Sequence, residues 1–439
     1  MNIGVVGQGF VGLSLSVFLA SKKIQVFGVE NNEEKLSVLK NGKSTFFEPK
    51  LNNVLQKCLE QKNLKFVNSL KPIFNKLDVV YICVPTPNKK SSINLTYIKN
   101  VISEIQKLLN HTTKKPLIVI KSTISPGTSK LLVNILSKNY KYILGENFYF
   151  AVNPEFLREG SAINDQFNPH ILVIGTEEIK SKNKIQSIYK KLYSKQIPRI
   201  FTNFSSAELI KYTNNAFLAT KISFINSISN LCEKIPGANV DDIAEAIGLD
   251  PRIGPYFLKA GPGFGGSCLP KDLISFIDVY KSFDVSPTLF NSVKNVNDKQ
   301  LEQILKILEN KFNKISGKTI SILGLSFKEN SDDIRESRSI KLIQNIIKKN
   351  CVINVFDSLA LENTKQIFKN KLVYCTSVSE CLKNSDCVII MNSEKIFKQI
   401  SKQNIETMRR QLIIDSRRII EQKIREMPKT EYVALGVND

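Results

Sequence analysis

The fold is decided by the stretch Asn2-Ile3-Gly4-Val5-Val6-Gly7-Gln8-Gly9-Phe10-Val11-Gly12, which an apolar segment and the strand-like residues 24–30 follow. This order of strand, glycine turn, helix and strand is typical of a Rossmann-like unit. Gly7, Gly9 and Gly12 keep the G-x-G-x-x-G spacing, which allows a tight turn and close approach of the backbone to a pyrophosphate. Glu30 ends the second strand, where its carboxylate could accept from a ribose hydroxyl and would repel a 2′-phosphate. The stretch therefore predicts a dinucleotide site for NAD rather than NADP.

Further apolar strands are expected at 79–84, 117–120 and 149–152. Ligands of open parallel sheets bind outside the carboxyl ends of the strands, so polar residues that follow those ends are site candidates. Taken singly, each such residue could equally cap a helix or close a turn. The candidates are Thr86, Thr123, Glu155 and Glu159.

The middle of the chain is helical in pattern, without proline from 205 to about 233. Lys211 and Asn215 stand four residues apart there, so they share one face of the expected helix. Such a pair could hold an oxyanion, and it could equally belong to a solvated face.

The last third repeats the N-terminal order of elements. A strand and turn are expected at 319–324 and a strand that ends in an acid at 352–357, without the full glycine fingerprint. The sequence therefore predicts an α/β fold with two Rossmann-like doubly wound domains joined by a central helical region with a long helix. We expect the first Rossmann-like domain at 1–204, the central helical region at 205–300 and the second Rossmann-like domain at 301–439.

A second glycine-rich segment carries a cysteine. It reads Gly261-Pro262-Gly263-Phe264-Gly265-Gly266-Ser267-Cys268-Leu269-Pro270-Lys271-Asp272. Glycines and prolines make a poor core but fit a loop around a ligand. Nearby cations and backbone N–H groups could stabilise a Cys268 thiolate as a nucleophile. The alternative is a surface turn with an incidental cysteine.

Composition narrows the class of protein. The chain has 439 residues, a net charge of +22, eight cysteines and two histidines. No apolar run reaches the roughly 18 residues of a membrane span, and no cysteine spacing indicates zinc or a disulfide scaffold, so we expect no membrane partner, no metal and a cytoplasmic protein. The positive charge raises the alternative of nucleic-acid binding, but the lysines are scattered, which favours a solvated surface that attracts small anions.

The pieces together resemble the UDP-glucose/GDP-mannose dehydrogenase family. The resemblance covers nearly the whole chain, in order, at 7–12, 84–87, 121–128, 153–160, 208–215, 261–272, 323–336 and 415–417. It implies oxidation of a primary alcohol on a sugar nucleotide to a carboxylate, with two NAD⁺ reduced per sugar and Cys268 carrying a thiohemiacetal and then a thioester. The segments 153–160 and 247–254 favour UDP-glucose, with UDP-glucuronate as product. GDP-mannose or a UDP-N-acetylhexosamine is the nearest alternative, and a nucleic-acid-binding protein is a remote one.

The resemblance also implies roles for individual residues. Catalytic roles fall to Cys268, Lys211, Asn215, Asp272, Glu155 and Thr123. Cofactor contacts fall to Gly7, Gly9, Val11, Gly12, Glu30, Lys35, Thr86, Thr123, Glu159, Lys271 and Arg335. Substrate contacts fall to Glu155, Phe156, Leu157, Arg158, Glu159, Lys211, Asn215, Arg252, Phe257, Leu258, Lys259, Ala260, Gly261, Gly265 and Lys328. The resemblance also implies a homodimer or a higher homo-oligomer, and it implies that the protein does not bind nucleic acid.

The chain departs from the family pattern in three places. Glu30 stands where Asp is usual, and its longer side chain should still reach a ribose. The segment 169–171 reads Pro-His-Ile in place of Pro-Asp-Arg, which removes a charge pair near the site. Ser416 replaces the usual Gly before Arg417, so the contact that the family gives Arg417 is less secure here.

Overall fold

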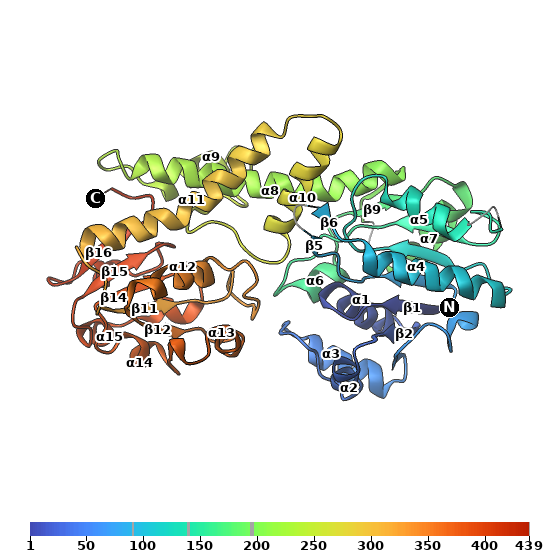
Figure 1. Cartoon of the computed structure of the whole chain (residues 1–439), viewed down its shortest axis with the longest axis horizontal. Helices are drawn as coiled ribbons and strands as arrows, with labels where there is room; N and C mark the ends of the chain where they lie inside the picture. Colours follow the sequence, from blue (N-terminus) through green and yellow to red (C-terminus); the bar gives the residue numbers. More distant parts are fainter. Residues whose placement is uncertain (90–91, 138–140, 194–196, 439) are drawn as a thin grey trace. The chain divides into compact units, whose positions relative to one another are not determined.

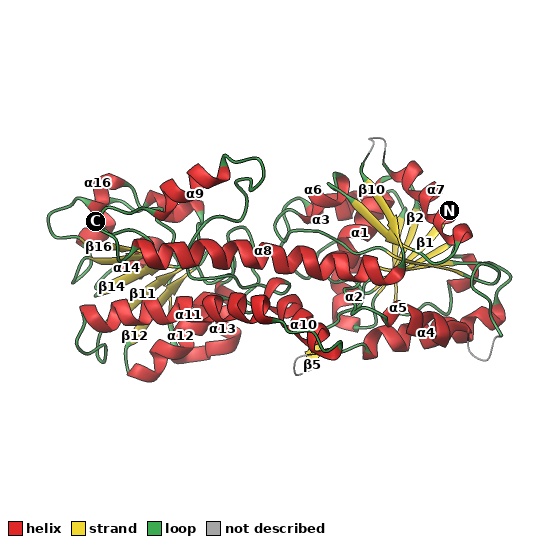
Figure 2. Ribbon diagram, turned by 90° about the horizontal axis from the view of Figure 1, so that it is seen from above, coloured by secondary structure: helices red, strands yellow, loops and turns green. Residues whose placement is uncertain are grey.

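The computed structural model describes residues 1–89, 92–137, 141–193 and 197–438. The chain divides into two compact units, residues 1–214 and 215–439. The boundary falls inside one continuous helix, α8 (Phe204–Cys232), which Figure 2 shows without a break.

The first unit is built on an eight-stranded sheet in the order β10-β9-β8-β7-β4-β1-β2-β3 (Figure 1). Its six strands from β3 to β8 follow the 3-2-1-4-5-6 order of a dinucleotide-binding fold. All pair in parallel, while β9 meets β8 through one antiparallel pair, Val152 with Gly175. The strands are β1 (Asn2–Val6), β2 (Gln25–Val29), β3 (Leu64–Val67), β4 (Val79–Ile82), β7 (Leu117–Ile120), β8 (Tyr149–Val152), β9 (Leu172–Gly175) and β10 (Arg199–Thr202), with a separate hairpin of β5 (Asn88–Lys89) and β6 (Ser92–Ile93).

Helices cover both faces of this sheet, because its strands are apolar on both sides. In β4, Val79 and Tyr81 face one core, while Val80 and Ile82 face the other. Full burial of such side chains contributes about 1.5–3 kcal/mol each. Residues of α1, α3 and α7 line the first core, and residues of α4 and α5 line the second. The helices are α1 (Phe10–Ser21), α2 (Glu33–Lys40), α3 (Leu51–Glu60), α4 (Thr96–Leu108), α5 (Thr128–Ser137), α6 (Ala162–Phe167) and α7 (Ile179–Leu192), with 3₁₀ turns η1 (Phe74–Lys76) and η2 (Leu109–His111).

The second unit holds an all-parallel sheet in the order β13-β12-β11-β14-β15-β16, which again follows the 3-2-1-4-5-6 pattern. The strands are β11 (Thr319–Leu323), β12 (Val352–Phe356), β13 (Val373–Tyr374), β14 (Cys387–Ile390), β15 (Leu412–Asp415) and β16 (Glu431–Ala434). The helices are the rest of α8, α9 (Val240–Gly248), α10 (Leu269–Ser282), α11 (Thr288–Lys311), α12 (Arg338–Ile346), α13 (Leu361–Phe368), α14 (Val378–Leu382), α15 (Lys402–Glu406) and α16 (Gln422–Arg425), with η3 (Ile347–Lys349), η4 (Lys369–Lys371) and η5 (Lys395–Gln399).

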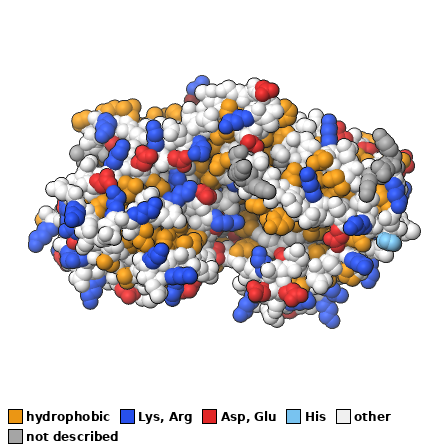
Figure 3. Space-filling view, viewed as in Figure 1, with side chains coloured by type: hydrophobic (Ala, Val, Ile, Leu, Met, Phe, Trp, Pro, Cys, Tyr) orange, Lys and Arg blue, Asp and Glu red, His pale blue; other side chains and the backbone are white. Residues whose placement is uncertain are grey.

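Two cores lie on opposite faces of the second sheet. Residues of α11 and α12 fill one, and residues of α14 and α15 fill the other. The predicted fold class, two Rossmann-like domains and a helical region with a long helix, is confirmed. No helix among the described residues combines the length and the apolar character that a membrane span requires. Lys and Arg side chains are scattered among acidic ones on the face that Figure 3 shows.

Candidate active site

The first glycine turn joins β1 to α1 and is shaped by close packing. Gly7 has φ +86°, a left-handed value that favours glycine. A Cβ on Gly12 would lie 1.8 Å from the carbonyl oxygen of Gly7, so no side chain fits there. A Cβ on Gly9 would meet nothing within 4 Å, and no side chain caps the N-terminus of α1. Open space at an uncapped helix N-terminus suits a pyrophosphate.

Glu30 lies directly after β2, beside this turn. One carboxylate oxygen accepts from the backbone N–H of Gln8 at 3.2 Å, and the other accepts from that of Asn32 at 3.0 Å. These two contacts hold the carboxylate at the carboxyl edge of the sheet, where a ribose is expected. Lys35 follows in the first turn of α2, exposed to solvent.

The other predicted strand-end residues of the first unit lie at the same edge. Thr86 is buried after β4, and Thr123 is partly buried after β7. Val11, on α1, packs against the adjoining core. The loop after β8 carries 155–159, and its exit is fixed by Glu48, whose carboxylate accepts from the N–H groups of Gly160 and Ala162, each at 2.8 Å. Arg158 in this loop forms a salt bridge with Asp165 at 2.7 Å.

A buried ion pair lies at the centre of this edge. Lys211 Nζ is 3.0 Å from Glu155 Oε1 and donates to the Glu155 carbonyl oxygen at 2.7 Å. The two side chains are 5% and 9% exposed. Burial opposes ionisation of Glu155, but Lys211, the N–H of Leu157 and Lys121 outweigh it and hold the pKa of Glu155 below its ordinary value. The ammonium of Lys211 also lies 5.4 Å from the ring centre of Phe156.

Lys121 is a functional candidate that the sequence analysis missed. It directly follows β7, and its Nζ donates to Asn153 Oδ1 at 3.1 Å. Asn153 is fixed in turn by its own bond to the Val173 carbonyl at 2.7 Å. Burial lowers the pKa of Lys121 to about 8. The sequence contained a sign of this role, because Lys121 directly follows the apolar run Leu117–Ile120. A lysine is costly to bury there unless a partner or a function requires it.

The cysteine loop belongs to the second unit, and three polar side chains hold it. Asn226 on α8 accepts from the N–H of Gly261 at 2.9 Å, and Gln300 on α11 donates to the Gly261 carbonyl at 3.2 Å. Asn297 forms two hydrogen bonds with the backbone of Phe264: it accepts from the N–H at 2.7 Å and donates to the carbonyl at 3.2 Å. Residues 261–266 are buried as a result, although the loop has few side chains of its own.

Cys268 emerges from this buried loop into an exposed position at the N-cap of α10. The other seven cysteines are buried or half-buried. The N-terminus of a helix favours the thiolate over the neutral thiol. One turn into α10, Asp272 is buried and accepts from Lys271 Nζ at 2.6 Å and from Asn215 Nδ2 at 2.7 Å. The structure therefore brings Asn215 and Asp272 together beside the cysteine-bearing helix end.

The remaining predicted substrate residues of the second unit lie on loops. Arg252 is exposed and forms a salt bridge with Asp250, and Arg335 does the same with Asp333, each at 2.6 Å. Phe257 has φ +66°, which is strained for an aromatic residue and turns the chain into the segment 258–261. Lys259 in this segment is exposed, whereas Leu258 and Ala260 are buried. Gly265 packs against the backbone of Glu336, where a Cβ would lie 2.4 Å from the carbonyl oxygen, and Lys328 lies partly buried after β11.

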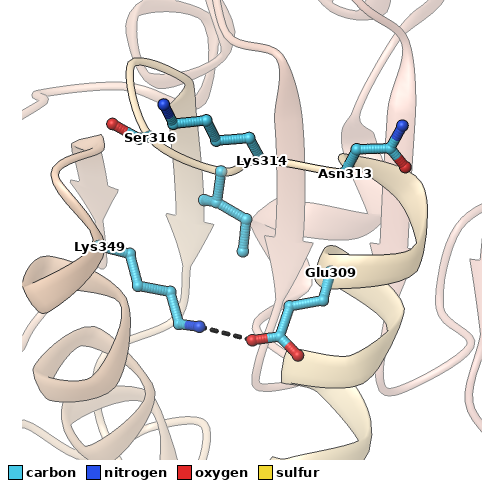
Figure 4. A pocket seen from close by; sticks show the side chains of 6 residues that line it. Glu309, Asn313, Lys314, Ser316 and Lys349 are labelled. Atoms are coloured by element: carbon cyan, nitrogen blue, oxygen red, sulfur yellow. Dashed lines mark hydrogen bonds and ion pairs between the residues drawn. The ribbon is translucent and has the colours of Figure 1, made fainter.

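A hollow of about 410 Å³ opens elsewhere on the second unit (Figure 4). Its lining is Glu309, Asn313, Lys314, Ile315, Ser316 and Lys349. It lies before the amino end of β11, and a salt bridge of 2.5 Å between Lys349 and Glu309 crosses it. It holds none of the predicted site residues, and ligands of parallel sheets bind at the opposite edge, so we do not assign the reaction to it.

Three family models match successive parts of the chain. They are the NAD binding domain at residues 1–193, the central domain at 205–299 and the UDP binding domain at 321–422 of one family. The chain belongs to the UDP-glucose/GDP-mannose dehydrogenase family. The resemblance inferred from the sequence is confirmed, as is NAD as the cofactor of the first domain. The open turn at Gly9 and the carboxylate of Glu30 fit that cofactor.

Individual members of the family are similar over the full chain. UDP-glucose 6-dehydrogenase of Rickettsia typhi is 36% identical over 440 residues, 99% of each chain. UDP-glucose 6-dehydrogenase YwqF of Bacillus subtilis is 37% identical over 91% of this chain and 89% of its own length. The solved UDP-glucose dehydrogenase of Pyrobaculum islandicum superposes with a TM-score of 0.92 at 30% identity, covering 99% and 98% of the two chains. Dehydrogenases are oxidoreductases, and this chain, with its NAD binding domain, is an NAD-dependent enzyme of that class.

Proposed function

We propose that this enzyme oxidises UDP-glucose to UDP-glucuronate with two NAD⁺, in two successive steps on one bound sugar. The observation that carries the proposal is Cys268, the exposed thiol at the N-terminus of α10, one turn from the buried Asp272. A two-electron alcohol dehydrogenase has no use for such a nucleophile, whereas an aldehyde can be oxidised again once a thiol has added to it.

The first oxidation converts the C6 alcohol of the sugar to an aldehyde. The turn of Gly7, Gly9 and Gly12 would hold NAD⁺, which would supply the hydride acceptor for both oxidations at C6. We propose Glu155, Lys211 or Asp272 as the group that takes up the hydroxyl proton. Lys211 donates toward the sugar oxygen as negative charge develops on it, and Asn215 donates from the next turn of α8.

Cys268 makes the second oxidation possible. Its thiolate adds to the aldehyde carbon and gives a thiohemiacetal, which loses a hydride to become a thioester. Water near Thr123 then attacks the thioester carbon, the C–S bond breaks, and the thiolate and the uronate carboxylate are released. Each of the two hydrides removes two electrons from C6, and one water supplies the second carboxylate oxygen. The four-electron oxidation of one sugar is thereby balanced.

Similarity to solved relatives supports UDP-glucose over a guanosine nucleotide. The GDP-mannose dehydrogenase of Pseudomonas aeruginosa superposes with a TM-score of only 0.56 at 27% identity, against 0.92 for the UDP-glucose dehydrogenase of Pyrobaculum islandicum. For the substrate we propose contacts with 155–159, Lys211, Asn215, Arg252, 257–261, Gly265 and Lys328. For the cofactor we propose Gly7, Gly9, Val11, Gly12, Glu30, Lys35, Thr86, Thr123, Glu159, Lys271 and Arg335.

The test is a panel of sugar nucleotides read by NADH absorbance. We expect UDP-glucose to yield two NADH per sugar consumed, with UDP-glucuronate as the only sugar product. GDP-mannose, UDP-N-acetylglucosamine and UDP-N-acetylmannosamine serve as competitors. A yield of one NADH, or a higher kcat/KM for another sugar nucleotide, would contradict the proposal.

We also propose that the enzyme is a homodimer or a higher homo-oligomer, paired through α8. Phe217, Phe224 and Leu231 recur every seven residues on this helix and are 63%, 51% and 55% exposed. Residues seven apart lie on one helical face, so they form an apolar stripe that a second copy of the same helix can cover. We expect Phe224→Glu to lower the molar mass in solution to that of one chain, measured by light scattering. Phe283, which is 65% exposed outside α8, provides the control Phe283→Glu, which should leave the mass unchanged.

We place the enzyme in the cytoplasm. No disulfide joins any of the eight cysteines, all of which lie in the described part of the chain, and this fits a reducing compartment.

A further inference from the structure

The second Rossmann-like sheet repeats the turn and the strand-end acid of the first. Gly324 follows β11 with φ +89°, as Gly7 follows β1, and Asp357 follows β12, as Glu30 follows β2. A Cβ on Gly324 would lie 2.5 Å from the Asn392 side chain, so Asn392 packs closely against this turn.

Asp357 is bound entirely by the protein. It is 2% exposed, and its Oδ2 accepts from the N–H groups of Leu325 at 2.7 Å and Ser326 at 3.0 Å. Its Oδ1 accepts from the N–H groups of Leu359 at 2.9 Å and Ala360 at 2.8 Å. The carboxylate thus holds the turn after β11 to the turn after β12.

Glu394 is a second buried carboxyl group at this place, 6% exposed. Its Oε2 accepts from the hydroxyl of Ser358 at 2.6 Å, whereas no N–H or O–H group of the described residues donates to its Oε1. Burial, and next the charge of Asp357, raise the pKa of Glu394 to about 7. A protonated Glu394 leaves no negative charge on the buried oxygen that lacks a donor, whereas an ionised Glu394 would repel the Asp357 carboxylate.

We infer that Glu394 is a neutral carboxylic acid beside the Asp357 carboxylate, and that this pair positions the turn from Gly324 to Lys328. The link to Lys328 is direct. Ser326 donates from its hydroxyl to the Lys328 carbonyl at 2.8 Å, and its hydroxyl oxygen lies 3.2 Å from Asp357 Oδ2. Asn392 donates to Ser326 Oγ at 3.1 Å and accepts from the N–H of Glu394 at 3.3 Å.

The inference rests on the proposed function in one respect, since Lys328 matters only if it contacts the UDP-sugar. Within that role, Glu394 is a positioning residue and touches no reacting atom. Asp357 is the titratable group that faces it among the described residues, and Ser358 is the other side chain that bonds to it.

The sign of the pH dependence follows from the raised pKa of Glu394. Below its ordinary pKa of 4.5, the proton is present in both the folded and the unfolded chain. As the pH rises from there to about 7, the unfolded chain releases the proton first, so the stability that the pair contributes is lost progressively. Above about 7, the folded enzyme ionises as well, two carboxylates repel, and the turn that carries Lys328 loosens.

The variant Glu394→Gln tests this, because an amide keeps the donor of the neutral acid and cannot ionise. Calorimetric titration with UDP should show the wild-type Kd rising about fivefold or more between about pH 6 and about pH 8.5. Glu394→Gln should show a rise smaller than about twofold over the same range. The matched control is Glu362→Gln on α13, an exposed acid, which should follow the wild type. Equal pH dependence in Glu394→Gln and the wild type would overturn the inference.

Infrared spectroscopy provides a measurement that does not depend on UDP. At about pH 6 the wild type should show the carbonyl stretch of a protonated carboxyl group that is absent from Glu394→Gln and retained in Glu362→Gln. Absence of that band from the wild type overturns the inference even if UDP-glucose proves to be the substrate. Conversely, failure of UDP-glucose as a substrate would leave the band and the UDP titration in support of the pair, so the two failures are distinguishable.

Discussion

Replacing Cys268 with Ala is expected to lower kcat for uronate formation by at least about 10³-fold, because removal of a covalent nucleophile removes the intermediate itself. The loop around Cys268 is held by Asn226, Asn297 and Gln300, none of which the substitution touches. The fold and the binding of UDP-glucose should therefore survive. Only the step that turns an aldehyde into a thioester is lost.

The measurement is product analysis together with calorimetric binding of UDP-glucose. Cys268→Ala should bind UDP-glucose with a Kd within about threefold of the wild type while forming no uronate. Cys351→Ala is the control, since Cys351 is a half-buried thiol outside the candidate site. Uronate formation at the wild-type rate by Cys268→Ala would remove Cys268 from the mechanism.

Lys211→Met is expected to have the second largest effect, on both rate and stability. The substitution leaves the Glu155 carboxylate buried without its ammonium partner, which costs about 3–5 kcal/mol in the free energy of unfolding. It also removes a donor to the developing oxyanion, which lowers kcat by about 10²–10³-fold. Because the pKa of Glu155 lies below its ordinary value, the pair stabilises the fold at neutral pH and ceases to do so as the pH falls through that lowered pKa.

The two effects separate in a double-mutant cycle. Adding Glu155→Gln to Lys211→Met should restore most of the lost stability, since no buried charge is then left unpaired, but it should not restore kcat. The surface pair Lys294–Asp298 on α11, with 47% and 48% exposed side chains, provides the control Lys294→Met. That variant should lose less than about 1 kcal/mol. Equal losses from Lys211→Met and Lys294→Met would show that the buried pair has no special role.

Much of the fold could be predicted from the sequence because its signals are local. The spacing of Gly7, Gly9 and Gly12 depends on backbone geometry within one turn, and the apolar strands are buried on both faces. The same local logic located Cys268 at the end of its loop. Even so, the sequence could not say whether that loop is buried or exposed.

Contacts between distant parts of the chain could not be predicted. Asn297 and Gln300 lie on a helix that looks solvated in sequence, yet both are buried against the backbone of the cysteine loop. Lys121 and Glu394 are likewise charged residues in sequence whose burial only the folded chain reveals. Their partners stand 32 and 37 residues away, at Asn153 and Asp357 respectively, so no local pattern links them.

Cys268 is exposed, whereas the other seven thiols are buried or half-buried. Labelling of this thiol should therefore measure the concentration of active sites in a sample. A thiol open to a sugar is also open to an alkylating agent or a peroxide, and the helix end that favours its thiolate favours both reactions. A reagent such as iodoacetamide should therefore modify one thiol per chain at first, and activity should decline in proportion to the label. The exposure that lets Cys268 reach the sugar also exposes it to oxidants, so oxidation of this one thiol should inactivate the enzyme.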